Sequence, residues 1–172
     1  MSWKIQICRA KPNPRGKDVT AVGSARAEQL LGEWVDLKNI GDVGVDLSVI
    51  HLAHTEYSYS CAVTDRFQRY WNGHASGRLN PLQTVRIHTG KSNTSLLMAG
   101  QDRQGTDIHA YAERSWFVLN NSCGDQLSVL WQGRNGQWYQ EDTAGYDPNP
   151  PDGGVLVRVG SSLVPSAYGT YR

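Results

Sequence analysis

The stretch Glu33–Ser48, which reads EWVDLKNIGDVGVDLS, decides the fold. In its first half Val35 and Leu37 alternate with polar residues, and this period of two predicts a β-strand with one buried face. The NIGDVG segment supplies two glycines where the chain can turn tightly, and VDLS then resumes the alternation with Val45 and Leu47. We therefore predict a strand, a tight connection and a second strand that share one core.

The same alternation recurs further along the chain. QTVRIHTG, residues 83–90, is predicted to be a strand with Val85 and Ile87 inward and with Arg86 and His88 outward. LSVLW, residues 127–131, precedes a GRNG hairpin turn, and VLVRV, residues 155–159, follows a loop of turn-forming residues. These strands predict an all-β domain. Its expected core contains Val35, Leu37, Val45, Leu47, Val85, Ile87, Leu127 and Val129.

Two local departures from plain strands are also expected. The inward-facing parity changes after Leu47, which predicts a β-bulge near Ser48–Val49. SARAEQLL, residues 24–31, is typical of one or two helical turns, with Ser24 as the N-cap.

Length and composition indicate one domain. The chain has 172 residues, and its 39% apolar content is enough to build a core, while 18 glycines and 7 prolines suit short strands joined by turns. We place the domain at residues 1–160, with a basic loop insertion at about 11–32 and a flexible tail at 161–172. No apolar run approaches the roughly 20 residues that span a bilayer, so no membrane partner is expected. The N-terminus lacks the apolar stretch of a signal peptide, which predicts a cytoplasmic location.

Cys8, Cys61 and Cys123 are widely spaced and odd in number. They form no CxxC pair, so the usual structural zinc site is not expected. In a reducing compartment we predict three free thiols.

The order of the motifs resembles the lamin tail domain family, whose members are immunoglobulin-like β-sandwiches. The family has a strand of the form E-W-V-E-L-x-N, a glycine turn and V-D-L-S, which Glu33–Ser48 follows closely. Its later pattern of leucine and asparagine followed by G-D is matched here by Leu119, Asn120, Gly124 and Asp125. The resemblance implies an immunoglobulin-like β-sandwich that acts as a docking domain, binding another protein or a second copy of itself.

The function expected first is therefore non-enzymatic binding, without a cofactor. Aromatic and arginine side chains gather in the segment after the second strand, and such groups are typical of interaction surfaces. The predicted surface contains Tyr57, Tyr59, Arg66, Arg69, Tyr70 and Trp71. The alternative interpretation is that these aromatic residues cover one open end of the sandwich.

The uneven charge suggests further alternatives. Residues 1–30 carry six cations against two carboxylates, a net charge of +4, whereas residues 92–172 carry five arginines against eight carboxylates, a net charge of −3. A nucleic-acid-binding module would use a basic patch of Lys4, Arg9, Lys11, Arg15 and Lys17. The charge split also allows head-to-tail self-association, in which VLVRV pairs with a neighbour's edge strand instead of closing its own sandwich.

A small hydrolase or metal-dependent enzyme is the third hypothesis, and neither is expected. The sequence contains no catalytic motif of a known spacing, and Glu141 and Asp142 would face apart in a strand. A metal-dependent site would have to combine His88 and His109 with Asp107.

Overall fold

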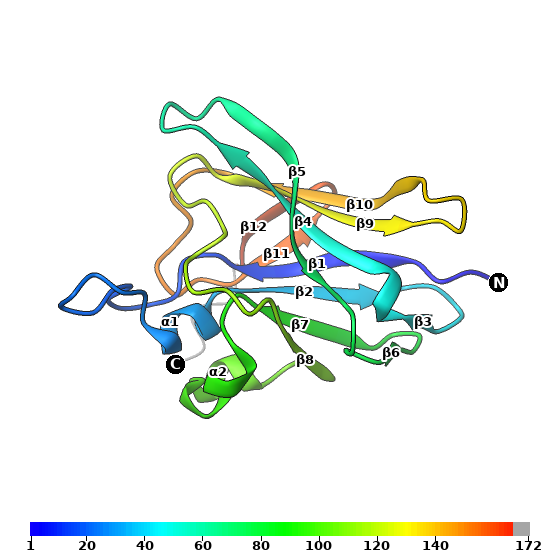
Figure 1. The fold of residues 1–172 in the computed structure, drawn as a ribbon, viewed down its shortest axis with the longest axis horizontal. Coiled ribbons are helices and arrows are strands. Elements are labelled where there is room, and N and C mark those ends of the chain that lie inside the picture. The colour runs from blue at the N-terminus through cyan, green and yellow to red at the C-terminus, as the bar shows by residue number, and fades with distance from the viewer. Residues whose placement is uncertain (167–172) are drawn as a thin grey trace.

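The computed structural model describes residues 1–166 and shows an all-β protein, with 43% strand and 11% helix. One large, mostly antiparallel sheet curls until it is nearly barrel-shaped (Figure 1). Its ten strands follow the order β5-β4-β9-β10-β12-β11-β1-β2-β7-β8, and a second sheet pairs β3 with β6. The all-β prediction is confirmed.

The elements have the following bounds: β1 (Ile5–Lys11), α1 (Ala27–Gly32), β2 (Trp34–Asn39), β3 (Val45–Asp46), the 3₁₀ helix η1 (Leu47–Val49), β4 (Ile50–Tyr57), β5 (Val63–Asn72), β6 (Arg78–Leu79), β7 (Thr84–His88), the 3₁₀ helix η2 (Ser92–Leu97), α2 (Gly100–Arg103), β8 (Ile108–Tyr111), β9 (Asp125–Gln132), β10 (Trp138–Tyr146), β11 (Leu156–Val159) and β12 (Ser162–Pro165).

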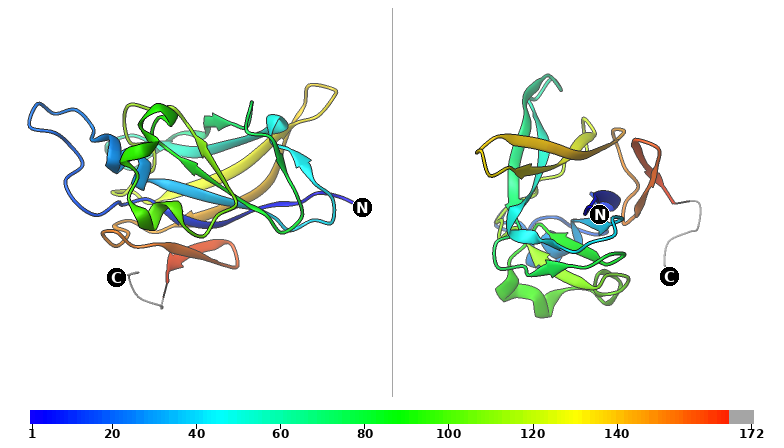
Figure 2. Two further views of the ribbon diagram at one scale, coloured as in Figure 1. Left: turned by 90° about the horizontal axis from the view of Figure 1, so that it is seen from below. Right: turned by 90° about the vertical axis from the view of Figure 1, so that its right-hand side faces the viewer.

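The sheet has two halves that face each other across the core. The half formed by β4, β5, β9 and β10 lies above the half formed by β1, β2, β7 and β8, and the β11–β12 hairpin connects them on one side (Figure 2). All eight residues predicted for the core belong to the buried apolar cluster between the halves, and each is 2% exposed or less. The strand periodicity therefore identified this part of the core correctly.

A polar residue within Glu33–Ser48 organises the turn that follows β2. Asn39, the last residue of β2, donates from Nδ2 to the carbonyls of Val43 (2.8 Å) and Leu79 (3.1 Å), and its Oδ1 accepts from the Gly41 N–H at 3.0 Å. A Cβ at Gly41 would lie 2.4 Å from the Ser2 carbonyl oxygen, so only glycine fits this turn. Asn39 thus fixes the tight connection that the sequence predicted.

The change of face after Leu47 is made by η1, and the predicted β-bulge at Ser48–Val49 is wrong. The Asp46 carboxylate accepts a hydrogen bond from the Ser48 N–H at 2.9 Å, so the chain enters a single 3₁₀ turn before β4 begins. The predicted helix exists as α1, but Ser24 does not cap it. Ser24 instead pairs with Thr20 in a turn of the preceding loop, and Arg26 holds the N-cap position.

The outer face of β2 and β7 is buried, which corrects the expectation that Arg86 and His88 face solvent. Helix α1 packs near β7, and Arg86 donates to the carbonyl oxygens of Asp102 (3.1 Å) and Gln104 (2.8 Å) on the segment that covers this face. The Arg86 guanidinium also donates to both Asp36 carboxylate oxygens, at 2.7 and 2.8 Å. Buried charges are stable only when they are paired and hydrogen-bonded, and this bidentate pair meets that condition.

The last described strands close the sheet within the chain. β11 pairs with β1 on one edge and with β12 on the other, so VLVRV has no free edge for a neighbour. β12 lies within the segment predicted to be a flexible tail, where Leu163 is buried in the core. The rest of that predicted tail, residues 167–172, lies outside the described residues.

Candidate binding groove

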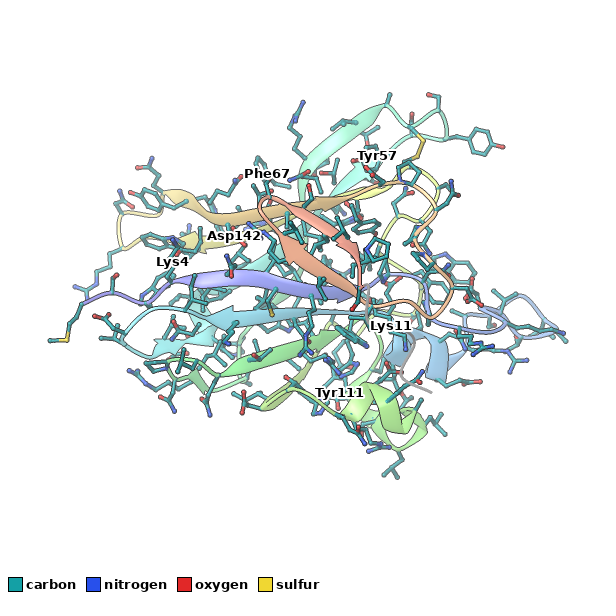
Figure 3. The ribbon with its side chains drawn as sticks, turned by 180° about the vertical axis from the view of Figure 1, so that it is seen from behind. Lys4, Lys11, Tyr57, Phe67, Tyr111 and Asp142 are labelled. Atoms are coloured by element: carbon teal, nitrogen blue, oxygen red, sulfur yellow. A yellow bond between two sulfur atoms is a disulfide. The ribbon has the colours of Figure 1, made fainter. Side chains whose placement is uncertain are left out.

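A groove of about 350 Å³ lies on the outer face of β4, β5, β9 and β10. Its lining consists of Thr55, Tyr57, Val63, Arg66, Phe67, Gln126, Ser128, Gln140 and Thr143, and none of these residues belongs to the core cluster. Tyr57 and Phe67 lie in the same half of the molecule, as Figure 3 shows, and both line the groove.

The strand register explains the floor of the groove. Ala53 is paired with Arg69 on β5 and with Ser128 on β9, and Ser128 is paired with Thr143 on β10. Paired residues of adjacent strands point to the same face, so these four side chains form one row across the outer face. Ser128, a small residue within this row, lines the groove together with Thr143.

The hairpin that forms one wall is held by a disulfide. Cys61, in the turn between β4 and β5, is bonded to Cys123 in the loop before β9. The predicted free thiols at Cys61 and Cys123 are therefore wrong, because only the fold brings residues 62 positions apart together. Cys8 remains free, and burial raises the pKa of its thiol to about 11.

A buried carboxylate adds a second tether between the hairpin and β9. Asp125 accepts hydrogen bonds from the N–H groups of Thr55 and Asn120, both at 3.0 Å, and His54 Nδ1 lies 3.1 Å from its Oδ2. The Gly124 backbone just before it has φ +72°, which favours glycine. The groove wall is thus fixed by both covalent and polar contacts.

Neutral polar side chains of the groove are partly ordered by each other. Gln126 Nε2 donates to Thr143 Oγ1 at 2.7 Å, and that hydroxyl donates to the Leu127 carbonyl at 2.9 Å. Thr55 Oγ1 donates to the Gln126 carbonyl at 3.2 Å. These contacts hold the Gln126 amide in a defined position at the groove, where its oxygen can accept a hydrogen bond from a ligand.

Aromatic and cationic side chains flank this polar floor. The Arg69 guanidinium lies 4.4 Å from the centre of the Trp138 ring, and His51 meets the same ring edge to face at 4.7 Å. Partial burial and the charge of Arg69 lower the pKa of His51, while partial burial and the Asp125 carboxylate raise the pKa of Tyr57. At neutral pH both rings are therefore uncharged, and the charges at the groove come from Arg66 and Arg69.

The predicted interaction surface is divided by the structure. Tyr57 and Arg66 line the groove, and Arg69 lies beside it, whereas Tyr59 is fully exposed at the hairpin turn. Tyr70 and Trp71 lie in the core, because the end of β5 packs against the apolar cluster.

The sequence did not predict several groove residues, among them Phe67, Gln126 and Gln140, nor Trp138, which contacts Arg69 beside the groove. The GRNG turn contained a usable signal for three of them, because it fixes the β9–β10 register and thereby places Gln126, Trp138 and Gln140. Phe67 stands between the predicted residues Arg66 and Arg69 in the sequence, but nothing in the local pattern shows that its ring stays outside the core.

The predicted basic patch does not form one surface. Lys4 and Lys11 lie at opposite ends of β1 (Figure 3). Lys11 is buried and forms an ion pair with Asp102 at 2.7 Å, and Arg9 forms one with Asp36 at 2.7 Å. Two of the five cations are therefore bound to buried carboxylates, one of which, Asp36, is shared with Arg86.

Three of the five basic residues line a second cavity, and Lys17 lies outside it. Arg9, Lys11 and Arg15 line a cavity of about 240 Å³ together with Asp102 and Asp152. Lys17 is exposed in the loop that precedes α1. This mixed charge offers no continuous cationic track for a phosphate backbone.

The residues of the metal hypothesis are only partly assembled. His88 Nε2 lies 2.8 Å from His109 Nδ1, but Asp107 accepts a hydrogen bond from the Thr84 N–H instead of joining the pair. Within residues 1–166 no three histidine, cysteine or acidic side chains are grouped so that they could hold a metal ion.

No protein-family model matches the chain, and no curated protein matches it significantly. None of the helices in residues 1–166 is long and apolar enough to cross a membrane.

Proposed function

We propose that the chain is a non-enzymatic binding module that recognises a protein partner, or a second copy of itself, through the groove on β4, β5, β9 and β10. The observation that carries the proposal is the pairing of exposed aromatic rings with Arg66 and Arg69, neither of which has an ion-pair partner among residues 1–166. Aromatic and arginine side chains dominate the centres of protein interfaces, whereas Lys, Asp and Glu are depleted there. The groove lining contains no Lys, Asp or Glu.

We also infer that the fold is an immunoglobulin-like β-sandwich of the lamin tail type. Three motif positions of the resemblance have structural roles that a shared fold would require: Glu33 accepts backbone hydrogen bonds from Val118 and Leu119, Asn39 orders the glycine turn, and Asp125 orders the start of β9. Docking domains of this family bind without catalysis, in agreement with a groove of neutral polar and aromatic side chains.

In this proposal the protein works in an oxidising compartment. This differs from the cytoplasmic location that the sequence predicted. The Cys61–Cys123 disulfide supports this location, because cytoplasmic thiols are kept reduced. Counting the free thiols of the protein isolated from its native cells tests the point. One free thiol per chain is expected, whereas three free thiols would indicate a reducing compartment.

The binding function is tested with an array of random ten-residue peptides. The wild-type chain should bind a subset of them, and Phe67→Ala should lose these signals because it removes a groove wall. The matched control is Leu96→Ala, which truncates another exposed apolar side chain, on η2. Binding that is equal in both variants would show that the groove is not the site.

Light scattering tests the self-association form of the proposal. A dimer or larger species that dissociates on Phe67→Ala is expected if a second copy occupies the groove. A monomer at every protein concentration would leave only the form with a different partner.

A further inference from the structure

We propose that the ligand of the groove is an extended acidic segment of a partner protein. This inference rests on the proposed function and specifies the chemistry of the partner. It is based on three features of the groove: its unbalanced positive charge, its neutral amide side chains and the blocked edge of β5.

The positive charge at the groove is not paired with a negative charge of the described chain. Within residues 1–166, Arg66 and Arg69 have no carboxylate within 4.0 Å, in contrast to Arg9, Arg26, Arg86 and Arg158. Other arginines of the described chain also lack one, but these two lie at the groove beside exposed aromatic rings. No carboxylate lines the groove either. Guanidinium groups pair preferentially with carboxylates, in a planar geometry that can be bidentate. The missing partners are therefore best supplied by acidic side chains of the ligand.

The amide side chains indicate a polypeptide more than another polyanion. Gln126 and Gln140 both present a carbonyl oxygen and an NH₂ group, and both residues are exposed at the groove. An extended peptide offers N–H donors and C=O acceptors in alternation, so it can satisfy both ends of each amide. A phosphate backbone offers acceptors only and would leave the glutamine oxygens without donors.

The apolar wall provides a place for one ligand side chain. Val63, Tyr57 and Phe67 come from the two strands of the same hairpin, and Phe67 is 46% exposed. Burial of an apolar ligand group against this wall would add affinity that does not depend on salt. The expected segment therefore combines acidic residues with at least one apolar or aromatic residue.

The ligand must lie across the face of the sheet and not along its edge. β5 is an edge strand, but the Asp65 carboxylate accepts from the Phe67 N–H at 2.9 Å, and Arg114 donates to the Tyr70 carbonyl at 3.0 and 3.2 Å. The β4–β5 pairing also contains register shifts. Capped and irregular edges are the features that prevent strand addition. The face of the groove is left as the binding surface.

The test uses the peptides that the array selects, each synthesised as a matched pair in which every Asp and Glu is retained or replaced by Asn and Gln. Fluorescence anisotropy on the disulfide-bonded full chain measures both affinities at low and high salt. The carboxylate form should bind at least tenfold more tightly at low salt, and the difference should shrink as salt rises. Arg66→Gln and Arg69→Gln should each weaken binding by about two- to fivefold, as expected for exposed ion pairs.

The control variant is Arg15→Gln, which removes an exposed arginine at the other cavity and should leave the affinity unchanged. Circular dichroism confirms that each variant is folded. Equal affinity of the carboxylate and amide peptides, with binding still lost in Phe67→Ala, would overturn the acidic ligand and leave the binding function in place. Failure of every peptide to bind would overturn both. Preferential binding of an acidic oligosaccharide or of single-stranded DNA over the peptides would overturn the choice of a polypeptide.

Discussion

Replacing Glu33 by glutamine tests whether a buried carboxyl at the start of the deciding stretch carries a proton. Glu33 is fully buried, and its Oε1 accepts from the Thr89 hydroxyl at 2.6 Å and from the Val118 and Leu119 N–H groups at 2.9 and 3.3 Å. Its other oxygen, Oε2, is buried and has no hydrogen-bond partner among residues 1–166. Burial raises the pKa of Glu33 to about 7, although these hydrogen bonds oppose the rise.

The sign and size of the effect follow from proton linkage. The ordinary pKa of 4.5 applies to the unfolded chain, so between pH 4.5 and about pH 7 the folded protein keeps a proton that the unfolded chain releases. The contribution to the free energy of unfolding is therefore complete below pH 4.5 and is lost as the pH rises through about 7. At about 1.4 kcal/mol per pKa unit, the loss is on the order of 3 kcal/mol.

The assay is urea unfolding followed by tryptophan fluorescence, at pH 5 and at pH 8, with the disulfide intact. The Glu33→Gln variant has no proton to lose, and its amide oxygen can still accept the three hydrogen bonds. The free energy of unfolding of the variant, relative to wild type, should therefore increase by about 2–3 kcal/mol between pH 5 and pH 8. A pH-independent cost of burying the amide NH₂ group cancels in this comparison.

Glu28→Gln is the matched control, because it removes an exposed carboxyl on the neighbouring helix α1. It shows how much of the change comes from the removal of any carboxylate. If the Glu33→Gln difference varies by less than about 0.5 kcal/mol between the two pH values, the buried carboxyl is ionised throughout and the linkage argument is refuted.

Three further predictions concern stability. Leu127→Ala should lower the free energy of unfolding by about 2–5 kcal/mol in urea titrations, since Leu127 is completely buried in the core, and a loss below about 1 kcal/mol would contradict this packing. Reduction of the Cys61–Cys123 disulfide should lower it by about 4 kcal/mol, the entropy of closing a loop of 62 residues, and a Cys61→Ser/Cys123→Ser double variant should be insensitive to reductant. Burial lowers the pKa of His88 to about 3. Acidification below pH 6.5 should therefore destabilise the wild-type protein, because the unfolded chain binds a proton at His88 that the folded protein does not bind. A His88→Gln variant should show a shallower decline, and an NMR titration that places the His88 pKa near 6.5 would disprove the cause.

The strand periodicity predicted the core because each predicted strand has one apolar face. It could not predict the second buried layer outside β2 and β7. Asp36 and Arg86 have the residue types of a solvent-exposed face, and their burial depends on a bidentate contact between strands that are 50 positions apart in the sequence. Alternating polar residues therefore indicate which face of a strand is polar, but they do not show that this face is exposed to solvent.

The groove was predicted in part for a related reason. The cluster of Tyr57, Arg66 and Arg69 is local in sequence, so composition alone identified the β4–β5 side of the groove. The opposite side comes from β9 and β10, more than 50 residues later, and only the strand register places Gln126 and Gln140 there. The disulfide was missed because cysteine spacing carries no information on distance in space when it is not one of the short metal or redox motifs.

The contrast between the two outer faces of the sheet is the strongest reason to place the function on the groove. Over β2 and β7, a polar sheet face is covered by α1 and by the segment around α2, and its charges are paired, as Arg86 is with Asp36. Over β4, β5, β9 and β10, Phe67 and Trp138 stay partly exposed, and within residues 1–166 the neighbouring Arg66 and Arg69 have no carboxylate within 4.0 Å. Stability alone would favour covering these rings or pairing these charges, because exposed apolar groups and unpaired cations contribute nothing to the folded state. An open face with both features is therefore better explained by a partner that covers the rings and pairs the arginines when it binds.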